Sequence, residues 1–259
     1  MFERIACGWS LLASSSGVLR RNKKLIVFPV LAGLGSLPVF VSFFYAFGML
    51  TRTPVFEQPI TGLPAMLTLV LACLLCWGFI VLFFYAALVR CALLSLRFGN
   101  ASIWRGICDA LSRLPQLLGL LLISASRVFL FRSLWLVVPI LMDEKSGAAK
   151  AFSRSRQLLR LHPMTTFWPG LLSVLGPILV FTVFSLFAWM GLETTSSYAI
   201  YYAGMCILAW IAVCWTIIGI YEAALYEYAA LGQIPAGFDG QALRLAFAGL
   251  PQNGGSWPS

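Results

Sequence analysis

Four stretches of this chain are apolar for long enough to cross a lipid bilayer, and this feature constrains its fold more than any other. They are residues 25–50, 64–89, 164–192 and 199–221. A helix rises about 1.5 Å per residue, so each stretch can cross a hydrocarbon core of about 30 Å. Lipid offers the backbone no hydrogen-bond partner, so a spanning segment must be helical. The sequence therefore predicts an all-α, polytopic transmembrane helical bundle with four clear spans.

The composition supports a membrane protein and argues against a nucleic-acid-binding one. Of the 259 residues, 60% are hydrophobic and 10% are charged. Soluble domains are about 45–50% apolar and about 25% charged. The net charge of +9 would suggest nucleic acid in a soluble protein. Here the tendency of cytoplasmic loops to collect Lys and Arg explains it, so we expect no nucleic-acid partner.

The distribution of Lys and Arg predicts the orientation of the chain. With the N-terminus inside, the outer loops are residues 51–63 and 193–198, and Arg52 is the only cation between them. Fifteen of the 18 Lys and Arg residues then fall in inner segments. This bias predicts a multi-pass protein of the cytoplasmic (inner) membrane with both termini in the cytoplasm.

The segments between the spans predict amphipathic surface helices at 2–20, 100–114 and 146–161. Residues 1–231 would form one membrane domain, and 232–259 a cytoplasmic tail. In the second surface helix, Ile103, Ile107, Leu111 and Leu114 form the apolar stripe. Arg105, Asp109 and Arg113 follow each other at i, i+4 and i+8, so we expect them to pair along its solvated face.

Residues 115–142 hold two apolar runs that are each too short to cross a bilayer. Basic segments lie on both sides, so this stretch should cross an even number of times or not at all. We expect a short hydrophobic hairpin that enters from the inside and returns. A helix lying at the membrane interface is the alternative.

Six basic residues are candidates for contact with an anion or an anionic lipid headgroup. Charges at membrane depth are costly, so Arg127 and Arg132, near the tip of the expected hairpin, are the first of them. The alternative is that both are turn residues reaching interfacial phosphate. The third surface helix supplies the other four, Lys150, Arg154, Arg156 and Arg160. For these, non-specific attraction to the anionic leaflet is the explanation that we favour over recognition of a specific lipid.

The carboxylates of the last span look at first like those of a proton-coupled carrier. Counted from Ala199, however, the span ends near Tyr221, which places Glu222 and Glu227 at the inner interface. The sequence has no phosphate-binding Walker A loop, HExxH or GxSxG motif. We therefore predict no enzyme activity, no cofactor and no metal site.

Four passages resemble the domain-of-unknown-function family 6159, a family of uncharacterised prokaryotic multi-pass membrane proteins. They are Trp9-Ser10 with 18–25 and Phe28-Pro29; 84–89; 137–141 with 151–155; and 223–226 with 237–239. The resemblance covers roughly residues 5–248 and implies a six-span protein without assigned chemistry. This chain departs from that pattern where it has only residues 115–142 in place of a full helical pair, which favours the short hairpin.

These observations predict a non-enzymatic scaffold or accessory subunit whose partners are the bilayer, its anionic headgroups and a further protein. The alternative is a channel or permease for a small or anionic solute, because proline-broken spans and an arginine-bearing hairpin resemble the broken helices of transporters.

Overall fold

The computed structural model of the protein describes residues 2–51, 59–99, 102–126, 136–144, 147–161, 182, 197–238, 240 and 243. Apart from residue 182, the expected span at 164–192 lies outside this part of the chain, and so do Arg127 and Arg132. All regular secondary structure in the described residues is helical, which confirms the all-α class.

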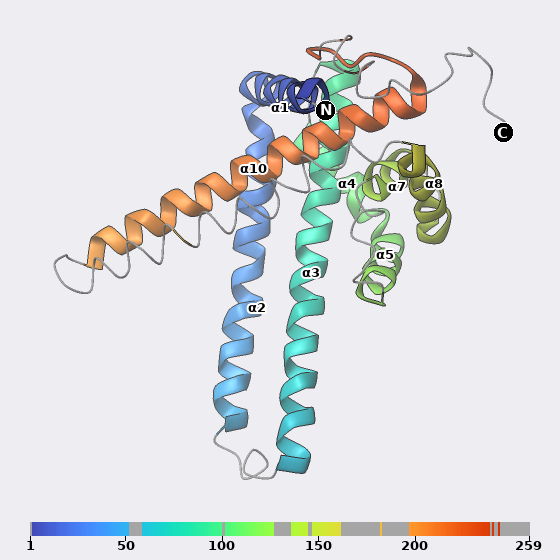
Figure 1. The fold of residues 1–259 in the computed structure, drawn as a ribbon. Helices are drawn as coiled ribbons and strands as arrows, with labels where there is room; N and C mark the ends of the chain where they lie inside the picture. The colour runs from blue at the N-terminus through green and yellow to red at the C-terminus, as the bar shows by residue number, and fades with distance from the viewer. Residues whose placement is uncertain are drawn as a thin grey trace.

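The described elements follow each other in the order α1 (Phe2–Arg21), the 3-10 helix η1 (Lys23–Ile26), α2 (Val27–Thr51), α3 (Pro59–Phe98), α4 (Ile103–Leu111), α5 (Leu114–Ser126), α7 (Val137–Glu144), α8 (Ala148–Leu161) and α10 (Ser197–Leu231). Helices α4, α5 and α7 are much shorter than α2, α3 and α10 and gather beside the end of α3 (Figure 1).

Three of these helices are long and apolar enough to cross a membrane: Lys23–Met49, Pro64–Phe98 and Leu208–Ala230. They overlap three of the four predicted spans. A fourth crossing is possible by length and composition if α4 and α5, which meet at a bend of 69°, act as one broken span or a re-entrant loop.

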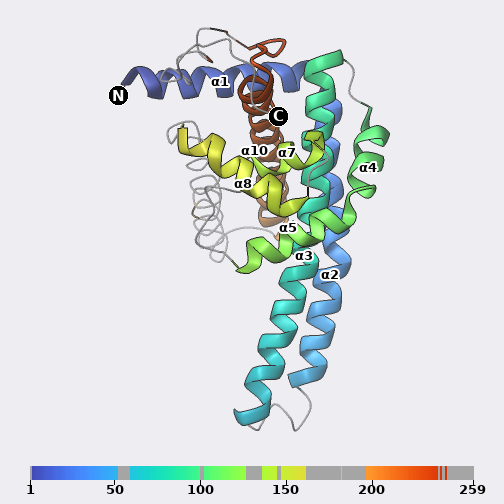
Figure 2. The same ribbon diagram turned by 90° about the vertical axis from the view of Figure 1, so that its right-hand side faces the viewer.

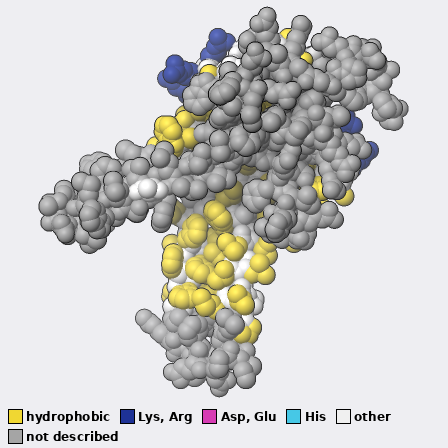
Figure 3. All heavy atoms as spheres, viewed as in Figure 1, with side chains coloured by type: hydrophobic (Ala, Val, Ile, Leu, Met, Phe, Trp, Pro, Cys, Tyr) yellow, Lys and Arg dark blue, Asp and Glu magenta, His cyan; other side chains and the backbone are white. Residues whose placement is uncertain are grey.

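Helices α2 and α3 lie side by side and project from the rest of the molecule as a long hairpin (Figures 1 and 2). No charged residue occurs in α2. The large side chains on the outside of the hairpin are apolar and exposed, and Figure 3 shows them as a continuous hydrophobic surface. They include Leu37, Val41, Phe44, Leu67 and Leu71. Because soluble monomers rarely expose such a surface, this part of the hairpin fits the lipid interior.

The other end of α3 is surrounded by helices, in what we call the head: α3 from Ala86 onward with α1, α4, α5, α7, α8 and the last turns of α10. Every residue of α3 from Ala86 to Leu96 except Arg90 is buried. All six residues from Val137 to Met142 of α7 are buried against it. The 40 residues of α3 measure about 60 Å. Since a hydrocarbon core is about 30 Å thick, α3 is long enough both to cross it and to run through the head.

Helix α1 lies across the end of the hairpin rather than along it (Figure 2). The corner between α1 and α2 is fastened to α3 by Asn22, whose side-chain amide donates to Ser95 Oγ at 2.6 Å. Leu11, Val18 and Leu19 of α1 are buried in the head, whereas Arg20 and Arg21 are exposed. This arrangement fits a helix that lies on the membrane surface, as the sequence predicts.

Helix α4 approaches α3 most closely through small residues. Gly106 and Ala110 are buried, whereas Leu111 is exposed. A Cβ on Gly106 would lie 2.9 Å from the carbonyl oxygen of Ala87, so a side chain there has no room. Ile103 and Ile107 of the predicted apolar stripe also pack against the core, but close approach of two backbones selects glycine and alanine at the contact itself.

The close contact at Gly106 gives a first prediction. Gly106→Ala forces α4 away from α3 and should lower the free energy of unfolding by about 1–3 kcal/mol, as overpacking does. The measurement is reversible unfolding in mixed micelles. Gly33→Ala is the matched control, because its Cβ meets nothing within 4 Å and alanine favours a helix. Equal stability of the two variants would show that α4 does not pack on α3 in this way.

Candidate functional site: a charge network in the head

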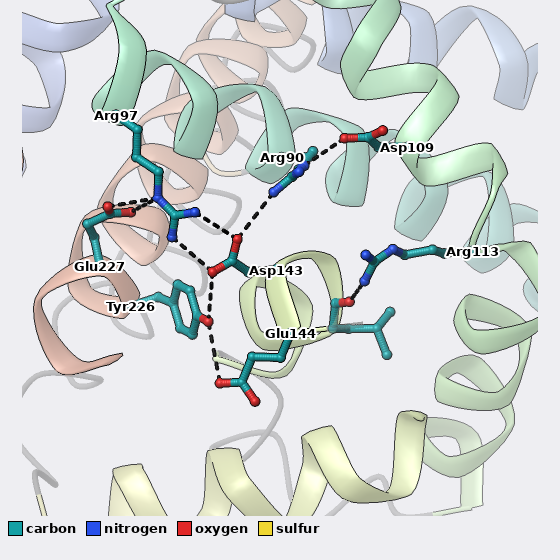
Figure 4. A network of polar contacts seen from close by, with 9 residues as sticks. Arg90, Arg97, Asp109, Arg113, Asp143, Glu144, Tyr226 and Glu227 are labelled. Carbon is teal, nitrogen blue, oxygen red and sulfur yellow. Dashed lines mark hydrogen bonds and ion pairs between the residues drawn. The ribbon is translucent and has the colours of Figure 1, made fainter. Parts of the chain in front are cut away.

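The charged side chains of the head come from four helices and meet around α3. Arg90 and Arg97 are seven residues apart on α3, and therefore lie two turns apart on one face. Asp143 and Glu144 end α7, Asp109 lies on α4, and Tyr226 and Glu227 lie near the end of α10. Figure 4 shows these groups converging on one another.

Asp143 is at the centre of this network. Arg97 Nη1 and Nη2 donate to Asp143 Oδ1 and Oδ2, each at 2.9 Å, in a two-pronged ion pair. Arg90 Nη1 donates to Oδ1 at 3.3 Å, and the Tyr226 hydroxyl donates to Oδ2 at 3.1 Å. One carboxylate thus joins α7 to α3 and α10, in the paired geometry that makes arginine–carboxylate contacts strong and directional.

The two arginines extend the network to the neighbouring helices. Arg90 Nε donates to Asp109 Oδ2 at 2.7 Å, which ties α4 to α3. Arg97 Nε donates to both oxygens of Glu227, at 2.8 and 3.0 Å, which ties α10 to α3. Arginine suits this position because its guanidinium donates in several directions at once.

Two further arginines complete the arrangement. Arg113, which is buried, donates to the backbone carbonyl of Leu141 and so connects the start of α5 to α7. Arg154 Nε of α8 pairs with Glu144 Oε1 at 2.9 Å, in the most exposed of these ion pairs. The network therefore reaches the helices that surround α3 in the head.

The network balances its own charge. Its four arginines (Arg90, Arg97, Arg113 and Arg154) match its four carboxylates (Asp109, Asp143, Glu144 and Glu227). These carboxylates are four of the nine in the whole chain, concentrated in one place. Removing charges from water costs several kcal/mol per ion, and only good pairing recovers that cost. The loss of one partner would therefore leave a charge in the head without compensation.

The pKa of Asp143 follows from this environment. Burial by itself raises it, but the hydrogen bonds from Arg97 and Tyr226 and the positive charges of Arg97 and Arg90 outweigh burial and hold it below its ordinary value of 3.8. A carboxylate with a depressed pKa stabilises the fold above its ordinary pKa, and this contribution is lost as the pH falls through the lowered value.

Two expectations about charged residues are corrected by these contacts. Asp109 pairs with Arg90 of α3 rather than with its neighbours on α4, and Arg113 is buried rather than on a solvated face. Glu222 and Glu227 are also buried between helices, with 5% and 3% of their surface exposed. They lie on α10, within the apolar segment Leu208–Ala230.

The structure describes the side chains of two of the six predicted anion-binding residues. Lys150 is exposed on α8, and Arg154, also exposed, pairs with Glu144. Arg156 and Arg160 belong to α8, but the structure does not describe their side chains. Arg127 and Arg132 lie outside the described residues, so their contact with an anion stays a prediction.

Sequence reasoning did not find the network because its partners are far apart in the chain. Arg97 and Glu227 are separated by 130 residues, and Arg97 and Asp143 by 46. One signal was available. Asp143-Glu144 follow a fully apolar run, and Arg90 and Arg97 interrupt another at two-turn spacing. Opposite charges within apolar helices of the same protein are expected to pair.

Comparison with known proteins finds no relative of this chain. No family model, no curated protein and no solved structure matches the chain. Among the described residues there is also no group of three or more His, Cys, Asp or Glu side chains that could hold a metal ion. The function is therefore inferred from the arrangement of the charged side chains in the head.

The central position of Asp143 gives a second prediction. Asp143→Asn should lower the free energy of unfolding at neutral pH by about 3 kcal/mol, because Arg97 loses its paired carboxylate. In the wild-type protein, stability should also fall as the pH drops from about 5 to about 3, and Asp143→Asn should reduce this pH dependence. The measurement is the midpoint of thermal unfolding in lipid nanodiscs at a series of pH values.

Glu144→Gln is the matched control, since it removes a neighbouring carboxylate whose partners are the half-exposed Arg154 and, at 3.4 Å, the Tyr226 hydroxyl. Its cost should stay under about 1 kcal/mol, as for other exposed ion pairs. Equal losses in the two variants would contradict the central role of Asp143.

Proposed function

We propose that this protein is a non-enzymatic scaffold or accessory subunit of the cytoplasmic membrane, with both termini in the cytoplasm. The observation that carries the proposal is the use of charge in the head. Each described ion pair there joins two different helices, so the charges hold the helices together instead of lining a space for a substrate. A rigid head on a lipid-facing hairpin suits a protein that positions other components.

The distribution of surface charge supports the proposed orientation. Arg20, Arg21, Lys23 and Lys24 are exposed beside the start of α2, and Lys150 is exposed on α8. Figure 3 shows Lys and Arg side chains at the head end and none on the described part of the hairpin surface. An anionic cytoplasmic leaflet attracts such a basic face at about 1 kcal/mol per charge. Anionic lipid headgroups are therefore the partners that we propose for this end.

The chain also resembles the domain-of-unknown-function family 6159, and we propose membership of that family on the motifs given above. The proposal assigns no chemistry, because that family has none assigned. It does imply relatives with a similar hairpin and a similar basic corner at residues 18–25.

A channel or permease for a small or anionic solute is the second candidate. The observation that favours it is the 69° bend between α4 and α5, since such a bend marks a broken span or a re-entrant loop. Transporters place broken helices at their binding sites. In this alternative, Arg127 and Arg132, which follow α5 in the chain, would contact the anion.

Native mass spectrometry of the protein, extracted together with its surrounding lipid, distinguishes the two candidates. The scaffold proposal predicts a second protein at fixed stoichiometry, retained unchanged in the double variant Arg127→Gln/Arg132→Gln. The permease alternative predicts a lone chain or homo-oligomer with a bound anionic molecule that is lost in the double variant. Lys150→Gln is the control for a general loss of positive charge, because that side chain is exposed on α8.

Finding neither a protein partner nor a bound anion would contradict both candidates. A membrane enzyme would then be the class to test. For an enzyme, one carboxylate-to-amide change should abolish the function in cells while leaving the amount of folded protein unchanged.

A further inference from the structure

One face of α10 contacts α3 beyond the charge network. Trp215, Gly219 and Glu222 follow each other at i, i+4 and i+7, so they lie on the same face of α10. Tyr85 of α3 lies against this face, and its ring packs edge-on against the ring of Trp215 with centroids 6.0 Å apart. Helix α10 therefore contacts α3 at Tyr85 here and again further along, where Arg97 meets Glu227.

The two helices approach each other closely at this level because Gly219 has no side chain. A Cβ on Gly219 would lie 2.7 Å from Leu88 Cδ2 and 3.6 Å from Tyr85 Cε2. Gly219 precedes Glu222 by one turn. The close approach therefore brings the Glu222 carboxyl group within reach of the Tyr85 hydroxyl, which donates a hydrogen bond to it.

That contact leaves one oxygen of the Glu222 carboxyl group without a hydrogen bond among the described residues. The residue is 5% exposed, and its Oε2 has no hydrogen-bond partner among the described residues. Glu227, five residues further along α10, is equally buried, but Arg97 engages both of its oxygens. A buried, unpaired anionic oxygen is strongly unfavourable, whereas a neutral carboxyl group is tolerated.

The other ionisable groups around Glu222 do not supply a counter-charge. On α3, Arg90 and Arg97 are directed to Asp109, Asp143 and Glu227, and Tyr85 is neutral. On α10, Tyr226 and Glu227 belong to the charge network, and Cys214 lies two turns before Glu222. On α7, Asp143 and Glu144 belong to it as well.

The remaining helices packed on α10 also supply no counter-charge to Glu222. Helix α2 has no charged residue. The side chains that α1 buries in the head, Leu11, Ser15, Val18 and Leu19, are uncharged. The 3-10 helix η1 also packs on α10, and its lysines, Lys23 and Lys24, are exposed. Neutralising Glu222 therefore requires something that the described side chains do not provide.

We propose that the Glu222 carboxyl group, positioned by Tyr85, is a proton-binding site buried between α3 and α10. A proton from water adds to Oε2 and forms the neutral carboxyl group, and its release restores the carboxylate. Throughout this exchange Tyr85 remains the hydrogen-bond donor. A metal cation fits less well, because it needs several oxygen ligands. The described side chains place only the carboxyl group and one hydroxyl there.

This site links proton binding to the contact between two candidate spanning helices. With the proton bound, the α3–α10 contact contains no net charge at Glu222. Without it, an uncompensated anion lies where Gly219 holds the helices closest. An ionisable residue inside an apolar span is by default a functional residue, and this one is separate from the network that holds the head together.

The test is infrared difference spectroscopy of the full chain in lipid nanodiscs at about pH 7, where exposed carboxyl groups are ionised. We expect a carbonyl stretch from one protonated carboxyl group per chain. Glu222→Gln should remove this band completely, whereas Glu227→Gln should leave it in place. Tyr85→Phe should shift its frequency, because the band then loses a hydrogen bond while Glu222 itself is retained.

The proposal is overturned if the wild-type protein shows no protonated carboxyl group at this pH, or if the band persists in Glu222→Gln. A band that appears only when sodium and potassium ions are withdrawn would show a cation site instead. Should Glu222→Gln fail to fold, the wild-type spectrum and the Tyr85→Phe shift still decide the question. An unshifted band in Tyr85→Phe would then reject Glu222 as its source.

Discussion

The ion pair between Arg97 and Asp143 is the interaction on which the packing of the head depends. Asp143 comes at the end of a helix that is too short to hold its place alone, and it is the point where α7 joins both α3 and α10. Arg97 at the same time binds Glu227 of α10. Two side chains thus bring together three helices whose sequences are far apart.

This arrangement explains why the molecule has two parts of different chemistry. The described residues in the projecting part of the α2–α3 hairpin expose apolar side chains and include no charged residue, so lipid can solvate them (Figures 1 and 3). The head contains the carboxylates and arginines that lipid would not tolerate, and each described ion pair there joins one helix to another (Figure 4). Buried ion pairs are weak sources of stability, but they are specific about which helices meet.

Glycines decide where the helices end and how closely they approach. Gly99 and Gly232 follow α3 and α10 with φ angles of 73° and 67°, a backbone conformation that favours glycine at a helix end. Gly106 and Gly219 instead allow α4 and α10 to approach α3. Without those close contacts, neither Asp109 nor Glu222 would reach its partner on α3.

The sequence predicts the hairpin well because its signal is local. A long apolar run without charges is visible directly in the sequence. Helices α2 and α3 begin and end close to the predicted limits, or extend beyond them. The charge network could not be predicted in the same way. For Asp109, the sequence suggested a partner one helical turn away, in a pair worth about 0.3–0.5 kcal/mol. The packing of Gly106 on α3 brings Arg90 within reach of Asp109 instead. For Glu222, the partner Tyr85 lies on another helix far away in the sequence, so no local pattern points to it.

The most direct test of this two-part structure is the membrane depth of single fluorescent labels along α3, in a background with the seven native cysteines replaced by alanine. Labels at Leu71 and Leu74 lie on the exposed side of the hairpin, and a label at Phe98 lies at the exposed end of α3. We expect quenchers attached to the middle of the lipid chains to act on the first two labels, and an aqueous quencher to act on the third. Equal access of the aqueous quencher to all three labels would contradict a hairpin in lipid with its head at the membrane edge.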